Sequence, residues 1–149
     1  MRIALSSDER TELTDFLIRE LKARGHEVIC FGAIADGDPE VDWPLASRNA
    51  AQAVVRGDAD EAIVCCWTGT GASIAANKLP GIRAALCHDA ETARGARIWN
   101  HANALALSLR ATSIPMAKEI LDAWFSTPYS EDEWNRQQIE RVRSLEQRS

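Results

Sequence analysis

Between residues 61 and 72 the chain reads Glu61-Ala62-Ile63-Val64-Cys65-Cys66-Trp67-Thr68-Gly69-Thr70-Gly71-Ala72. The first half is apolar almost throughout, which is typical of a strand with both faces covered. The second half is a glycine turn that leads into a helical pattern. Glycine lets backbone N–H groups approach a ligand there, and a helix N-terminus favours negative charge. This strand–turn–helix unit indicates an α/β fold.

Outward from this unit, four more apolar runs alternate with helical patterns. We predict strands over residues 3–5, 27–31, 61–66, 82–87 and 104–107. We predict helices over residues 13–21, 44–57, 72–78, 90–99, 116–125 and 131–145. Such alternation implies a five-stranded parallel sheet with right-handed crossovers and helices on both faces, a Rossmann-like three-layer sandwich. Residues 1–149 are expected to form one domain, with a C-terminal helix from about 130 to 145.

Composition excludes several classes of function. The net charge is −5 and charges of both signs are mixed, which argues against nucleic acid as the main partner. No run of about 18 apolar residues occurs, so no membrane partner is expected. The opening residues turn polar too soon for a signal peptide, which favours a cytoplasmic protein. The four cysteines lack zinc spacing, and we expect no metal site.

Ligands in parallel α/β sheets bind at the carboxyl ends of the strands. That rule selects Asp8 and Glu9, Asp42 and Trp43, the segment 66–71, His88 and Asp89, and Arg110. Each has a structural alternative. The acidic pair suits a helix N-terminus, Arg110 suits an ordinary ion pair, and a glycine turn without a Walker lysine also serves as a plain tight turn.

Cys66 ends the predicted strand beside the glycine turn. A thiol near a helix N-terminus is stabilised as the thiolate and can act as a base or nucleophile. Cys65 must point to the opposite face of the sheet, so at most one of the two lines the cleft. The alternative is that both are small core residues.

The run Gly69-Thr70-Gly71-Ala72-Ser73-Ile74-Ala75-Ala76-Asn77-Lys78-Leu79-Pro80-Gly81-Ile82-Arg83-Ala84-Ala85-Leu86-Cys87-His88-Asp89 closely resembles the ribose-5-phosphate isomerase B / galactose-6-phosphate isomerase family. The match continues through Asn100, Asn103-Ala104-Leu105-Ala106-Leu107 and Arg110, and covers about residues 1–125. It implies a metal-independent, cofactor-free aldose–ketose isomerase that works through an enediolate.

The resemblance also implies a role for each matching residue. Cys66 matches the catalytic base, and Thr68 with the N–H groups of Gly69 and Gly71 matches the pocket for the developing oxyanion. The remaining matches concern substrate: Asp8 and Asp42 for the sugar, Arg110 for phosphate, and Asn100 supplied by the neighbouring subunit. The implied assembly is a homodimer or tetramer with shared active sites.

Four departures from the family pattern bear on the substrate. Glu9 stands where the family has a phosphate-contacting histidine, and Trp99 replaces its ring-opening histidine. Trp67 replaces a glycine and Trp43 a tyrosine, which should narrow the pocket. Arg136 and Arg141 are candidates for a C-terminal arginine pair, in an unsettled register.

These departures favour a tetrose phosphate over ribose 5-phosphate, because indole cannot shuttle the proton that opens a furanose ring. In a competing account His101 takes over ring opening. Two further alternatives remain: an isomerase of a non-phosphorylated sugar, which Glu9 favours, and a non-catalytic sugar-phosphate binding protein on the same fold.

Overall fold

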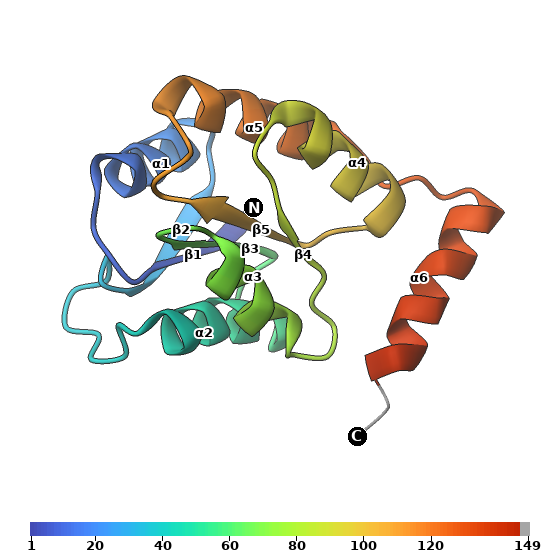
Figure 1. The fold of residues 1–149 in the computed structure, drawn as a ribbon, viewed down its shortest axis with the longest axis horizontal. Helices are drawn as coiled ribbons and strands as arrows, with labels where there is room; N and C mark the ends of the chain where they lie inside the picture. The colour runs from blue at the N-terminus through green and yellow to red at the C-terminus, as the bar shows by residue number, and fades with distance from the viewer. Residues whose placement is uncertain (147–149) are drawn as a thin grey trace.

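The structure is a computed structural model that describes residues 1–146. A single parallel sheet lies at its centre, with strand order β2-β1-β3-β5-β4 (Figure 1). Its strands are β1 (Arg2–Ser7), β2 (Glu27–Gly32), β3 (Glu61–Cys66), β4 (Ala84–Leu86) and β5 (Ala104–Ser108). The order changes direction beside β1 and β3, where their carboxyl ends open a crevice for a ligand.

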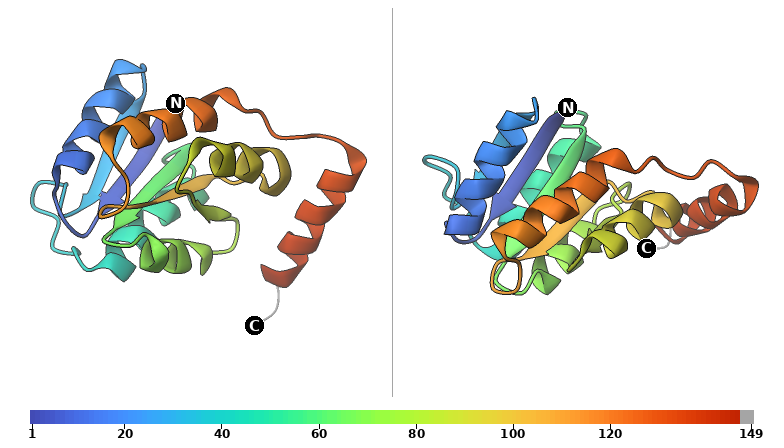
Figure 2. Two further views of the ribbon diagram at one scale, coloured as in Figure 1. Left: turned by 45° about the horizontal axis from the view of Figure 1, so that its top comes forward. Right: turned by 90° about the horizontal axis from the view of Figure 1, so that it is seen from above.

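Helices cover both faces of the sheet. The helices are α1 (Glu12–Ala23), α2 (Trp43–Val55), α3 (Thr70–Asn77), α4 (Ala90–Asn100), α5 (Ile114–Ser126) and α6 (Glu133–Glu146). Helices α1, α4 and α5 lie on one face and α2 and α3 on the other, while α6 stands apart beyond the β4 edge (Figures 1 and 2). The predicted three-layer α/β fold is confirmed. Within residues 1–146, no helix is long and apolar enough to span a membrane.

The two sheet faces carry side chains of different size. Large groups such as Leu5, Leu105 and Trp124 pack under α1, α4 and α5. Under α2 and α3 the core is mainly alanine, with Val64 at its centre. Cys65 belongs to the first core and so lies opposite its neighbour Cys66, which belongs to the second.

The fourth strand is shorter than predicted. We expected 82–87, but the ladder with β5 pairs residues 84–86. The side chain of Asn103 accounts for the later start, because its Oδ1 accepts from the N–H of Arg83 at 2.8 Å and its Nδ2 donates to the carbonyl of Gly81 at 2.9 Å. These side-chain bonds take the place of strand pairing.

Helix α6 is held at both ends, so it bridges the β4 edge rather than packing flat on it. Near its start, the Ser130 N–H donates to the Ile98 carbonyl at 3.1 Å and the Tyr129 hydroxyl donates to the Ala102 carbonyl at 3.1 Å. Near its end, Glu146 Oε1 accepts from the N–H of Gly81 at 3.0 Å. A groove therefore lies beneath α6.

Candidate active site

Cys66 lies at the end of β3 where the glycine turn begins. Its Sγ accepts a hydrogen bond of 3.4 Å from the N–H of Ala72, in the first turn of α3. Cys65 points into the opposite core, where burial raises the pKa of its thiol. The predicted opposition of the two cysteines is confirmed, and Cys66 is the one beside the turn.

A cavity of about 300 Å³ opens at this point. It gathers residues from the ends of β1 and β3 and the starts of α2 and α3. Its lining consists of Asp8, Trp43, Cys66, Trp67, Thr68, Thr70 and Gly71. Six of these seven are residues that the sequence indicated as substrate contacts or catalytic groups, on separate segments of the chain, and the fold brings them together.

Two glycines shape the turn. Gly69 has φ +78°, and a Cβ there would lie 2.9 Å from the backbone of Leu107 in β5. Gly71 lies against the ring of Trp43, where a Cβ would come within 2.9 Å of the indole. The turn thus packs tightly between β5 and Trp43. In the described chain the N–H groups of Thr70 and Gly71 have no acceptor, so both remain available to a ligand.

Asp8 brings an unpartnered carboxylate to the cavity. Its Oδ1 is buried, and no group within residues 1–146 donates to it. Burial raises the pKa of the Asp8 carboxyl, and the nearby charge of Glu9 raises it further. A buried acceptor without a donor is unfavourable, so a ligand hydroxyl would fit here.

Asp42 and Arg110 lie at the same end of the sheet. Asp42 precedes α2, yet its carboxylate makes no capping hydrogen bond to that helix. The N–H of Arg110 donates to the carbonyl of Trp67 at 3.0 Å, which ties this residue to the turn. Its exposed guanidinium has no ion-pair partner among the described residues, so the ordinary ion pair considered from sequence is not formed.

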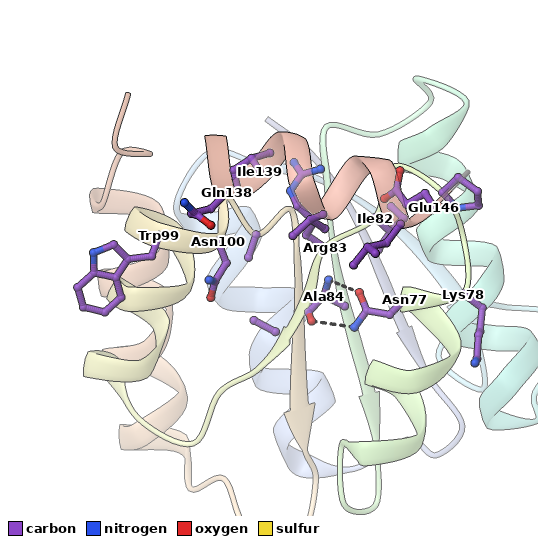
Figure 3. A pocket seen from close by; sticks show the side chains of 15 residues that line it. Asn77, Lys78, Ile82, Arg83, Ala84, Trp99, Asn100, Gln138, Ile139 and Glu146 are labelled. Carbon is purple, nitrogen blue, oxygen red and sulfur yellow. Dashed lines mark hydrogen bonds between the residues drawn. The ribbon is translucent and has the colours of Figure 1, made fainter. Parts of the chain in front are cut away.

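Four candidate residues lie on or beside α6, away from this cavity. Trp99 and Asn100 line the groove beneath α6, a separate cavity of about 660 Å³ (Figure 3). Arg136 and Arg141 are on α6, where Arg136 pairs with Glu131 and Arg141 with the Gln138 side chain. Within one chain, these residues do not meet Cys66.

His101 is enclosed rather than open to substrate. Its ring stacks on Tyr129 with a centroid separation of 4.5 Å, and its Nε2 lies 2.7 Å from the Ser130 carbonyl. The residue ends α4 in a left-handed conformation, φ +48°. Both features give His101 a structural role, which disfavours it as the ring-opening group.

Thr70 is a cavity residue within the selected segment 66–71, but no role of its own was predicted for it. It is the first residue of α3, and its hydroxyl lies 2.7 Å from that of Thr68. Its position directly after Gly69 was the available signal. As for metals, residues 1–146 contain no group of three or more histidine, cysteine, aspartate or glutamate side chains placed to hold an ion.

Comparison with known proteins agrees with this geometry. A family model described as Ribose/Galactose Isomerase matches residues 3–144. The ribose-5-phosphate isomerase B of Escherichia coli (strain K12) is 38% identical over 132 residues, which cover 89% of this chain and 87% of that protein. Galactose-6-phosphate isomerase subunit LacB of Clostridium acetobutylicum is 36% identical over 125 residues, or 84% and 71% of the two chains. The structure of Clostridium thermocellum ribose-5-phosphate isomerase B superposes with a TM-score of 0.89 at 37% identity, covering 98% of this chain and 97% of that one.

A parallel α/β sheet with a cysteine at its glycine turn, matched over nearly its whole length, defines an enzyme of the aldose–ketose isomerase class. The chain belongs to the ribose/galactose isomerase family and is a sugar-phosphate isomerase. The expectation of an enzyme, rather than a non-catalytic binding protein, is confirmed.

Proposed function

We propose that the chain interconverts an aldose phosphate and a ketose phosphate through an enediolate, with Cys66 as the base. The thiolate takes a proton from carbon 2 of the aldose. The resulting thiol exchanges its proton with solvent while the enediolate is bound, and it then gives a proton to carbon 1. The hydroxyl proton on oxygen 2 leaves as that oxygen becomes the ketose carbonyl, and oxygen 1 gains a proton. The observation that supports this proposal most directly is the position of Cys66 Sγ, which lines a cavity beside the N-terminus of α3.

The glycine turn supplies donors for the charge that develops on oxygen. The free N–H groups of Thr70 and Gly71 open towards the cavity end of α3, and the hydroxyl of Thr68 lies beside them. Preorganised donors of this kind contribute about 3 kcal/mol each to transition-state stabilisation. Asp8, with its unpartnered Oδ1, is placed to accept from a sugar hydroxyl.

We further propose a tetrose phosphate as the preferred substrate. A tetrose with phosphate on its last hydroxyl cannot close a five-membered ring, so it needs no ring-opening acid. Trp99 stands in the position of the family's histidine, and His101 is held by Tyr129 and Ser130. The indoles of Trp43 and Trp67 border the cavity and favour a short substrate.

The phosphate needs cations that this cavity does not itself contain. Its lining has an acid, two indoles and hydroxyls, and Glu9 lies next to Asp8. Arg110, tied to Trp67 and without an ion-pair partner in the described chain, is the cation we assign to phosphate. Because Arg136 and Arg141 lie on α6, any contribution from them comes from a second copy.

We also propose a dimer with shared active sites. The groove under α6 exposes Val142 and Leu145 at 40% and 60% of their surface, and Trp99 and Asn100 lie along it. Contact with a second copy would bury this apolar surface. It would also carry Asn100 to the partner's Cys66 cavity, as the family resemblance implies.

The test is an isomerisation screen of tetrose, pentose and hexose phosphates beside the free sugars, run in deuterium oxide. We expect the highest kcat/KM for erythrose 4-phosphate or erythrulose 4-phosphate, with deuterium entering the product carbon that receives the proton. A preference for free sugars would favour the non-phosphorylated alternative, which the charge of Glu9 supports. Isomerisation without any solvent deuterium would argue for direct hydride transfer and against the Cys66 mechanism.

A further inference from the structure

Two threonine hydroxyls face each other in the active-site cavity. Thr68 Oγ1 and Thr70 Oγ1 are 2.7 Å apart, the usual separation of two hydroxyls joined by a hydrogen bond. Both residues line the cavity that Cys66 opens into. We propose that Thr70 is a positioning residue. Its hydroxyl donates a hydrogen bond to Thr68 Oγ1, so that the Thr68 hydroxyl is left to donate to the substrate oxygen. This inference rests on the proposed function, in which Thr68 donates to the enediolate.

The direction of the hydrogen bond between the two hydroxyls decides whether Thr68 can donate to the substrate. Each hydroxyl has one proton to donate and two lone pairs that accept. If Thr68 donated to Thr70, it would have no proton left for the substrate oxygen. Donation from Thr70 leaves the Thr68 proton free, and it polarises Thr68 so that its bond to an oxyanion strengthens. A substrate oxyanion therefore selects the Thr70-to-Thr68 direction.

Helix capping does not account for this contact. The residue that precedes α3 is Gly69, which has no side chain, and no side-chain hydrogen bond caps the helix. Threonine at a helix start commonly bonds to a backbone N–H, yet the recorded partner of each hydroxyl is the other hydroxyl. The two side chains thus form a chain that ends at the cavity.

Two backbone N–H groups of α3 near Thr70 already have acceptors, so they do not bond to the Thr70 hydroxyl. The N–H of Ala72 is committed to Cys66 Sγ, and the N–H of Ser73 to the carbonyl of Gly69. Among residues 1–146, the Thr70 hydroxyl makes no hydrogen bond to Cys66 or Asp8, the other polar groups of the cavity. Its hydroxyl acts on the reaction through Thr68.

The test compares Thr70→Val, Thr70→Ser, Thr68→Val and the double valine variant on the preferred substrate. Valine keeps the branched shape and removes the hydroxyl. We expect Thr70→Val to lower kcat by about tenfold with KM changed by less than about twofold, and Thr70→Ser to retain near-normal kcat. The double variant should be no slower than Thr68→Val alone, because Thr70 acts through Thr68. Ser73→Ala, which removes a hydroxyl from the same helix outside the cavity, is the matched control.

Three results would overturn the inference in distinguishable ways. A normal kcat for Thr70→Val, with a large loss in Thr68→Val, removes Thr70 from the reaction and leaves the proposed function intact. A normal kcat for Thr68→Val removes the donor itself, and the inference falls together with that part of the proposed function. If the kcat losses of the two single valine variants multiply in the double variant, Thr70 acts independently of Thr68, which also contradicts the proposal. Thermal unfolding of each variant verifies that the fold persists.

Discussion

The N–H of Ala72 donates to Cys66 Sγ over 3.4 Å, so the first turn of α3 fixes the thiol at the floor of the cavity. Cys66→Ala removes the proposed base, and we expect kcat to fall by about 10²–10⁴-fold while the fold persists. The measurement is steady-state kinetics on the preferred substrate, with circular dichroism to verify folding.

Cys65→Ala is the matched control for that variant. Its side chain lies in the other core, where burial raises the pKa of the thiol and keeps it protonated. We expect a loss of about 1 kcal/mol in the free energy of unfolding, the cost of a small core truncation, and near-normal kcat. Equal loss of activity in both variants, each folded, would contradict the assignment of Cys66.

The β3–turn–α3 unit was predictable because its information is local. An apolar run, two glycines and an apolar helix start are adjacent in sequence, and they alone specify the strand, the left-handed turn at Gly69 and the placement of Cys66. The opposite orientation of Cys65 followed from strand geometry. The carboxyl-end rule selected Asp8 and Trp43, and both line the same cavity as Cys66.

Features that depend on distant partners were not predictable. The fourth strand was shortened by the side chain of Asn103, twenty residues beyond Arg83. His101 was enclosed by Tyr129, whose ring arrives from the segment before α6. The contact between the Thr70 and Thr68 hydroxyls could not be predicted either, because it depends on the backbone conformation of the turn. Periodicity cannot report such contacts, because it describes one element at a time.

Asp8→Asn should raise the free energy of unfolding at pH 7 and lower activity. Burial and the Glu9 charge raise the pKa of Asp8 in the folded chain, so the folded state holds this proton more tightly than the unfolded state. Stability is therefore lost as pH rises from about 4 through the folded pKa. The neutral amide escapes that loss, so its advantage over the native chain should shrink as pH falls towards about 4.

Asp89→Asn is the control, because we expect it to lower the free energy of unfolding at pH 7 where Asp8→Asn raises it. Asp89 Oδ1 accepts from the Thr92 N–H at 2.7 Å, which lowers the pKa of the Asp89 carboxyl. Its stabilisation is present at neutral pH and is lost as pH falls through the folded pKa. Urea unfolding between pH 7 and about 2 should show two differences of opposite sign: the Asp8→Asn difference shrinks as pH falls towards about 4, and the Asp89→Asn difference shrinks only below about 4. A pH-independent Asp8→Asn difference would refute the account of Asp8.

Mixing two inactive variants tests the shared site. In a mixed dimer of Cys66→Ala and Asn100→Ala subunits, one site loses both residues and the other is intact. Random exchange makes half of the dimers mixed, so the expected activity is about one quarter of the native value. Sites contained within one chain would instead give no recovery. Sedimentation of Leu145→Asp, which charges the groove under α6, should show dissociation in parallel.

Arg110→Ala should raise KM for a phosphorylated substrate by about tenfold or more, with a smaller effect on a free sugar. Its guanidinium has no ion-pair partner in the described chain, so the substitution removes a ligand contact rather than a structural one. Arg136→Ala on α6 is the comparison, since that residue pairs with Glu131 at 3.2 Å in its own chain. An unchanged KM for Arg110→Ala would place the phosphate elsewhere.

Trp99→His should increase kcat/KM for ribose 5-phosphate and leave the tetrose phosphate less affected. A pentose 5-phosphate is mostly a closed furanose, and imidazole can transfer the proton that opens it at neutral pH. The present indole folds back along α4 onto Gly95, where a Cβ would meet its ring at 2.9 Å, and it stays 57% exposed. No neighbouring side chain needs it for packing in the core, so the fold should accept the change.

The ratio of kcat/KM for erythrose 4-phosphate against ribose 5-phosphate is the measurement that separates the accounts of ring opening. Trp99→His should lower this ratio by about tenfold or more, because general acid–base groups contribute about 10²–10⁴-fold to proton transfer. Trp99→Ala, which clears space without adding an acid, should not reproduce the gain for ribose 5-phosphate. His101→Ala should weaken the fold near Tyr129 and change both substrates alike. If the native enzyme prefers ribose 5-phosphate and His101→Ala abolishes that preference, His101 opens the ring and the tetrose proposal is wrong.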